Sequence, residues 1–270
     1  MKYPSIVLVF ALSLSPLISF AQTNDKNGDD ADALIIMVNL ERIRAQLQLA
    51  DQSLAAGDRE SAFAHAFIPH TTTFPSLKER LKELDDQSAT ELEAFLTDLP
   101  IDIRTGELSV DALRQEIARI NTAIDSTLDK LGPLTTDKGI VSQTVVFLLR
   151  DAIKSYQTSN GGSSQIEYEN AVGLVNLAEW KYRSIAALFE ERRKAEIDSF
   201  FAELKSYIEQ RQPYESIVRL ATAIERDFAE ELSISAGSEN ASEHTTYFST
   251  IRDLLGKVVT EVNKGNYELA

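Results

Sequence analysis

The segment SVDALRQEIARINTAIDSTLDKL, residues 109–131, decides the fold class. Its large apolar residues recur every three or four positions, at Leu113, Ile117, Ile120, Ile124, Leu128 and Leu131. Residues at this spacing share one face of an α-helix. Ser109 can cap the first turn, and Gly132-Pro133 cannot continue a helix. The segment therefore predicts an amphipathic helix that needs other helices to cover its apolar stripe.

The same period extends outward on both sides of this segment, with few glycines or prolines to interrupt it. It predicts further helices over residues 30–56, 59–68, 76–85, 89–97, 139–157, 166–210, 213–232 and 243–263. We expect loops at 70–75 and 98–109, and a break in the longest helix near Gly173 or Ser184. No stretch shows the sustained alternation of a β-strand. The predicted fold is all-α, with long antiparallel helices in one or two bundles.

The chain begins with the pattern of a secretion signal. Lys2 supplies a positive start, residues 6–20 are mainly apolar, and Ser19 and Ala21 are the small residues that a signal peptidase requires. We predict a signal peptide over residues 1–21 and an extracytoplasmic location, in the periplasm, at the cell surface or secreted. The alternative is a retained anchor, although the run is shorter than the ~20 residues of a spanning helix.

The flexible stretch SNGGSS, residues 159–164, is the best domain boundary that the sequence offers. It predicts an N-terminal helical bundle over 22–158 and a C-terminal bundle of long helices over 165–270. The alternative is that the two parts pack as one unit.

Composition excludes several classes of function. The 270 residues include 27 basic and 42 acidic side chains, for a formal net charge of −15, so nucleic acid is not an expected partner. There is no cysteine, which excludes thiol catalysis, Fe–S clusters and cysteine-type zinc sites. An acidic surface suits solubility, a cation or a basic partner, and composition does not choose among them.

Two of the three histidines lie close together in the sequence, at His65 and His70, and carboxylates precede them at Asp58 and Glu60. Mixed imidazole and carboxylate ligands suit a transition-metal ion, so these four residues are the predicted metal site. In the alternative interpretation, His65 is a helix C-terminal residue favoured by the dipole and His70 is a loop residue. The two interpretations differ in whether the histidines converge in space.

Motifs of catalysis are missing from the sequence: there is no nucleophile elbow, phosphate loop or EF-hand pattern. Three histidines in these contexts give little scope for a Ser-His-Asp triad. We therefore expect a protein that is not an enzyme.

An internal repeat links the two ends of the chain. Residues 43–62, IRAQLQLADQSLAAGDRESA, align without gaps to 251–270, IRDLLGKVVTEVNKGNYELA, with six identities. In both copies an apolar helix ends at a glycine suited to the left-handed conformation, and a polar turn starts the next helix. The second copy ends soon after its turn, which predicts either a frayed end or a truncated form of a longer protein.

The hairpin turns carry a family resemblance, through Gly57-Asp58-Arg59-Glu60-Ser61-Ala62 and Gly265-Asn266-Tyr267-Glu268-Leu269-Ala270. In these turns the chain resembles the extracytoplasmic helical domain of prokaryotic high-affinity iron permeases. The resemblance implies iron handling, with a membrane permease or another cell-envelope protein as partner. The Arg-Glu-x-x-Glu iron motif of the permease itself is absent, so transport is not implied.

These observations lead to one hypothesis and one alternative. The hypothesis is an exported, non-enzymatic helical-bundle module that binds a metal cation, iron being favoured, and presents it to a membrane partner. The alternative is a structural or protein–protein interaction module with no ligand.

Overall fold

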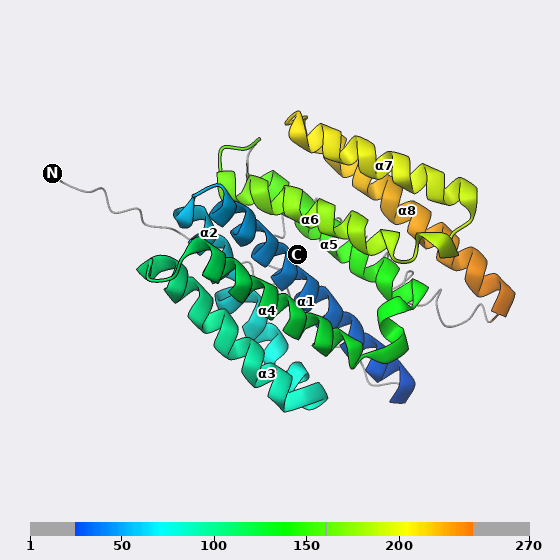
Figure 1. Cartoon of the computed structure of the whole chain (residues 1–270). Helices are drawn as coiled ribbons and strands as arrows, with labels where there is room; N and C mark the ends of the chain where they lie inside the picture. Colours follow the sequence, from blue (N-terminus) through cyan, green and yellow to red (C-terminus); the bar gives the residue numbers. More distant parts are fainter. Residues whose placement is uncertain (1–24, 160, 240–270) are drawn as a thin grey trace, which may run out of the picture.

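The computed structural model describes residues 25–159 and 161–239, and over these residues the fold is all-α (Figure 1). The helices are α1 (Asp25–Ala55), α2 (Arg59–Ile68), α3 (Phe74–Thr105), α4 (Val110–Asp129), α5 (Lys138–Thr158), α6 (Gln165–Arg183), α7 (Glu191–Glu209) and α8 (Tyr214–Glu239). A π-helical turn, η1, covers Pro69–Thr73, and short 3₁₀ turns cover Gly132–Thr136 and Ala186–Leu188. The predicted signal peptide, the 243–263 helix and the second repeat copy lie outside the described residues.

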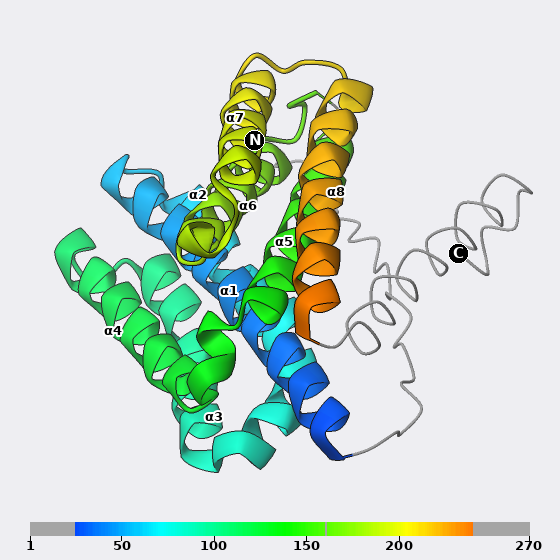
Figure 2. The ribbon, with the colours of Figure 1, turned by 90° about the vertical axis from the view of Figure 1, so that its right-hand side faces the viewer.

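Helix α1 lies at the centre of a helical bundle. It contacts α2, α3 and α4 on one side and α5 and α6 on the other (Figures 1 and 2). From Ile36 to Ala50 every residue of α1 is buried except Arg42 and Gln48. Helices α7 and α8 pack as a pair against α6 and α5. Within the described chain, no helix is long and apolar enough to cross a membrane.

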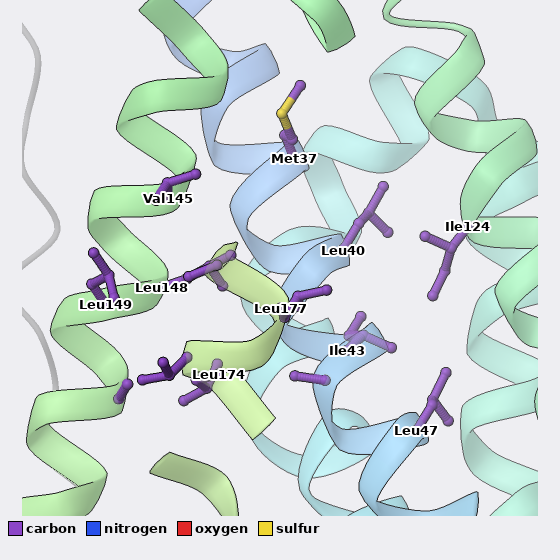
Figure 3. Packing of buried hydrophobic residues seen from close by; sticks show 14 of the residues in the cluster. Met37, Leu40, Ile43, Leu47, Ile124, Val145, Leu148, Leu149, Leu174 and Leu177 are labelled. Atoms are coloured by element: carbon purple, nitrogen blue, oxygen red, sulfur yellow. The ribbon is translucent and has the colours of Figure 1, made fainter. Parts of the chain in front are cut away.

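The core is a continuous apolar cluster that extends from α1 to α8. Leu40, Ile43 and Leu47 project from α1, and Ile124 faces them from α4 (Figure 3). On the other side α5 and α6 contribute their own apolar side chains, including Leu148 and Leu177 (Figure 3). Residues 159–164 connect α5 to α6, and these two helices pack along each other.

The stripe that predicts α4 is confirmed. Leu113, Ile117, Ile120 and Ile124 are all buried, and the Ser109 hydroxyl accepts a hydrogen bond from the Ala112 backbone N–H at 3.2 Å. The helix ends before the predicted Gly132-Pro133 stop.

The turn predicted for the first repeat copy is also confirmed. Gly57 adopts a left-handed conformation with φ of +80°, and the Asp58 N–H donates to the Ser53 carbonyl at 2.8 Å. This is the hydrogen bond of a Schellman ending, which satisfies a carbonyl at the end of α1 and lets α2 return along it.

Two predicted loops, 70–75 and 98–109, are wrong over most of their length. After Pro69 the backbone continues as η1 and enters α3 at Phe74, and α3 then runs through Pro100 to Thr105. Pro100 and its neighbour Leu99 are buried, so packing outweighs the hydrogen bond that a proline removes. Helix α3 ends only at Gly106, where φ is +72°.

The sequence predicts two separate helices over 76–85 and 89–97, and the structure has a kink in α3 between them. Asp85 has an extended conformation, with φ of −166° and ψ of 102°, and its carboxylate accepts hydrogen bonds from the Gln87 N–H and the Ser88 hydroxyl. Helix α3 begins two residues before the predicted start at Ser76, and the Ser76 hydroxyl donates a hydrogen bond to the Thr73 carbonyl.

Of the two break positions considered in the 166–210 segment, Ser184 is the one that the chain uses. Helix α6 ends at Arg183 and α7 begins at Glu191. The break returns Phe189 against the Tyr182 ring, at a centroid distance of 5.7 Å, and lets Phe201 of α7 stack on the same ring. A straight helix could not bring these three rings together.

A buried charge network crosses the centre of the bundle. The Glu41 carboxylate is fully buried on α1 and accepts hydrogen bonds from Lys181 Nζ of α6 at 2.9 Å and from Arg44 Nε at 3.1 Å. Arg44 also pairs with Asp125 of α4, at 2.6 Å. Because unpaired buried charges are costly, this network specifies which faces of α1, α4 and α6 meet.

Replacing Glu41 by Ala should destabilise the fold by about 3 to 5 kcal/mol, because it leaves the buried Lys181 ammonium without its carboxylate. Urea unfolding followed by far-UV circular dichroism measures this loss. The control is Glu116→Ala, which breaks the more exposed pair with Arg119 and should cost below about 1 kcal/mol. Equal losses in the two variants would show that the buried network does not stabilise the bundle.

Candidate functional site

His65 is fully buried in α2 and holds three helices together. Its Nδ1 lies 3.0 Å from Gln46 Oε1 of α1, and its Nε2 lies 3.0 Å from Glu169 Oε2 of α6. The Gln46 amide nitrogen in turn donates to Asn170 Oδ1 at 3.0 Å. Both ring nitrogens are thus occupied by protein atoms, which is the arrangement of a buried polar side chain whose hydrogen bonds are satisfied.

His70 lies in a different environment. It belongs to η1, is half-buried, and its Nδ1 is 3.4 Å from the Thr97 hydroxyl of α3. That hydroxyl donates a shorter hydrogen bond, of 2.7 Å, to the Glu93 carbonyl. The His70 ring packs near Phe67, with the centroids 6.4 Å apart.

Asp58 and Glu60 occupy the start of α2. The Asp58 carboxylate caps the helix by accepting hydrogen bonds from the Ser61 N–H at 3.0 Å and the Ser61 hydroxyl at 2.7 Å. These bonds, first of all the one from the backbone, lower the pKa of Asp58. Glu60 is exposed in the first turn, where the helix dipole favours an acidic residue.

The four residues of the predicted metal site, His65, His70, Asp58 and Glu60, are therefore not brought together as a ligand set. Among the side chains that the structure describes, those of residues 30–159 and 161–232, no group of three or more His, Cys, Asp or Glu is placed to hold a metal ion. His65 does lie in the last turn of α2, as the alternative interpretation has it, but it is held there by Gln46 and Glu169, and His70 lies in η1 and not in a loop.

His70 instead lines a shallow apolar groove between α2 and α3, with a volume of about 410 Å³. We call it the α2–α3 groove, and its lining residues are Phe63, Phe67, His70, Thr97, Pro100, Ile101, Arg104 and Thr105.

One wall of the α2–α3 groove is a row of three rings. Phe63 and Phe67 stack with centroids 5.5 Å apart and an interplanar angle of 19°, and His70 continues the row. The rings recur at intervals of four and three residues, so each lies about one turn of ~5.4 Å from the next. The row depends on η1, because only a backbone that stays helical past Pro69 carries His70 onto the same face.

The other wall comes from the last turns of α3, where Pro100 is buried and Ile101 projects outward. Four large apolar side chains of the described chain are clearly exposed: Phe67 (39%), Ile101 (54%), Trp180 (55%) and Leu188 (55%). Two of the four lie in this one groove. The Trp180 ring elsewhere is partnered by the cationic groups of Arg44 and Lys181, which lie 5.9 and 6.0 Å from its centroid.

Arg104 marks one end of the α2–α3 groove. Its guanidinium lies 5.4 Å from the centroid of the Phe63 ring, and it has no carboxylate partner among the described residues. Most arginines of the described chain are paired with Asp or Glu, as Arg42 is with Asp151. The groove lining itself contains no acidic residue, in a chain whose net charge is −15.

A second hollow, of about 450 Å³, lies between α7 and α8 and differs in kind. Its charged side chains neutralise one another: Arg193 pairs with Asp227 at 2.9 Å and with Glu230 at 2.8 Å, and Arg192 pairs with Glu196. Burial raises the pKa of Asp227. These contacts fasten α7 to α8, so the α2–α3 groove is the better candidate for a binding surface.

The sequence analysis does not predict the α2–α3 groove, although the residues of one of its walls lie close together in the sequence. The spacing of Phe63, Phe67 and His70 already marks one helical face. The groove was not predicted because loops were expected at 70–75 and 98–109. His70 and Ile101 were therefore placed outside helices, and nothing indicated that they lie in one groove.

Replacing His65 by Ala should cost about 3 kcal/mol, since it leaves a cavity and deprives Gln46 and Glu169 of their partner. Replacing His70, which is half-buried and makes only a long contact, should cost below about 1 kcal/mol. Urea unfolding of the two variants provides the comparison. A His65→Ala variant as stable as His70→Ala would contradict the structural role of His65.

The Asp58 cap should make stability depend on pH. Because its pKa is lowered in the folded state, the stabilisation is complete above the usual value of 3.8 and is lost as the pH falls through the lower, folded-state pKa. At neutral pH, Asp58→Ala should lose about 1 kcal/mol of unfolding free energy. The difference from wild type should shrink below pH 3.8, whereas Asp58→Asn should cap without that dependence. A pH-independent difference for Asp58→Ala would contradict this assignment.

Comparisons with protein-family models, curated proteins and solved structures give no match to this chain. The resemblance to the extracytoplasmic domain of iron permeases is tested by none of them and stays a prediction. The α2–α3 groove is therefore interpreted from its own geometry.

Proposed function

We propose that this protein is a non-enzymatic interaction module that works outside the cytoplasm and binds another protein in the α2–α3 groove. The observation that carries the proposal is the coincidence of Phe67 and Ile101, two of the four exposed large apolar side chains, in one groove. Contiguous exposed apolar surface rimmed by polar groups is typical of protein-binding sites.

The energetics favour occupation of the groove. Full burial of a Phe or Ile side chain stabilises a complex by roughly 1.5 to 3 kcal/mol relative to leaving it exposed. Phe67 and Ile101 are only partly exposed, so each offers a fraction of that amount, and the neighbouring Phe63 and His70 rings add to it. A partner that covers Phe63, Phe67 and His70 buries apolar surface at several adjacent positions, and each position stabilises the complex.

The groove is also held in shape before any partner arrives. Arg59 donates hydrogen bonds to the Ile103 carbonyl at 3.2 Å and to the Leu108 carbonyl at 3.0 Å, which ties the end of α3 to the start of α2. Leu99 and Ile103, on the inner side of α3, are buried in the core. A preformed surface loses little conformational entropy on binding, which favours affinity.

The location outside the cytoplasm rests on the secretion pattern of residues 1–21. A metal-presenting role is less well supported than protein binding, because His65 is engaged by Gln46 and Glu169 and lies in a different environment from His70.

The test is selection of binding peptides from a displayed library of amphipathic helices against the chain from Gln22 to Ala270. Selected peptides should bind the Phe67→Ser/Ile101→Ser variant at least about tenfold more weakly than wild type, a difference of about 1.4 kcal/mol. Leu188→Ser changes an apolar residue as exposed as Ile101 that does not line the groove, and this variant should bind the peptides as wild type does.

Circular dichroism and urea unfolding of both variants check that the fold is kept. Equal binding to wild type and to the groove variant would refute the proposal, as would a failure to select any peptide.

A further inference from the structure

We infer that the α2–α3 groove receives an amphipathic α-helix of a partner protein, with its apolar stripe on the ring row and a carboxylate paired with Arg104. This inference rests on the proposed function and adds the chemistry of the partner.

The shape of the two groove walls favours a helical partner. One wall is the ridge of Phe63, Phe67 and His70 on α2 and η1, and the other is formed by Thr97, Ile101 and neighbouring residues of α3. A helix packs by placing its own ridge of side chains between such ridges. The ring centroids are 5.5 and 6.4 Å apart, close to the ~5.4 Å rise of one helical turn, so a stripe at intervals of three and four residues matches them.

Arg104 is the reason to expect a carboxylate on the partner helix. It is exposed at the Phe63 end of the groove, lies over that ring, and has no acidic partner among the described residues. A planar guanidinium binds a carboxylate through two parallel hydrogen bonds, and the apolar groove would shield the pair from water on one side. An acidic residue at the end of the partner's stripe therefore completes the site.

The rest of the chain restricts the partner further. A net charge of −15 repels a strongly acidic helix and attracts a basic one at long range. The partner that satisfies both conditions has an apolar stripe, a single Asp or Glu at the Arg104 end, and lysines on its outward face. A uniformly acidic helix would satisfy Arg104 but not the remainder of the surface.

The experiment uses synthetic helical peptides of about 14 residues, long enough to cover the ring row at ~1.5 Å per residue. All carry lysines on the outer face and Leu, Ile or Phe at stripe positions, and they differ at one end position, which is Glu, Gln or Lys. Fluorescence anisotropy measures their binding to wild type, to Arg104→Glu and to Arg219→Glu. Arg219→Glu is the matched control, because it makes the same charge change on α8, away from the groove.

Wild type and Arg219→Glu should bind the Glu peptides about three- to fivefold more tightly than the Gln peptides, with a smaller difference at high salt. Arg104→Glu should reverse the order, so that the Lys peptides bind best. Charge reversal keeps the test independent of stability, because a variant that merely unfolded would lose all three peptides alike.

Three results would overturn the inference, and they separate it from the proposed function. If the peptides bind through Phe67 and Ile101 but do not distinguish Glu from Gln, the carboxylate is wrong and the binding groove stands. If sedimentation finds a dimer that Phe67→Ser/Ile101→Ser dissociates, a second copy of the chain is the occupant, and the partner helix is wrong. If no peptide binds and the chain is monomeric, both the inference and the proposed function fail.

Discussion

The burial of α1 on all sides is the constraint on which the rest of the structure depends. A helix surrounded by other helices can place apolar side chains in every direction, but each of its polar side chains then needs a specific partner. Glu41 finds Lys181 on α6, and Gln46 finds His65 on α2. Arg44 reaches Asp125 on α4. The apolar contacts drive association, and these polar pairs fix which helix lies against which face of α1.

Features that depend on neighbours in the sequence could be predicted, whereas those that depend on distant neighbours could not. The α4 stripe and the Schellman turn at Gly57 are set by local spacing and by one left-handed glycine, and both are confirmed. The loops predicted at 70–75 and 98–109 follow Pro69 and contain Pro100, and a proline removes a backbone hydrogen bond from a helix. Both prolines are buried in this fold, and the packing of the segments that contain them outweighs that local cost.

The candidate site follows the same division. Sequence proximity suggested that His65 and His70 act together, but α2 and η1 direct them to opposite kinds of environment. His65 faces the core, where Glu169, more than a hundred positions away in the sequence, meets it. His70 reaches the groove only because the chain stays helical beyond Pro69. The sequence shows that His65 can form hydrogen bonds, but its partners depend on how α1 and α6 pack against α2.

The α2–α3 groove also differs from the remainder of the surface in its electrostatics. Most arginines of the described chain pair with a carboxylate, and the charges in the hollow between α7 and α8 are neutralised internally by Arg193 and its partners. Arg104 is one of four arginines of the described chain without a carboxylate partner, and of these it is the one that lines the groove, against the ring row to which the exposed Phe67 belongs. The Arg104 guanidinium lacks a carboxylate, and the apolar surface at Phe67 is exposed to water. One ligand that supplies an apolar stripe and a carboxylate accounts for both, whereas a purely apolar or purely anionic ligand accounts for one.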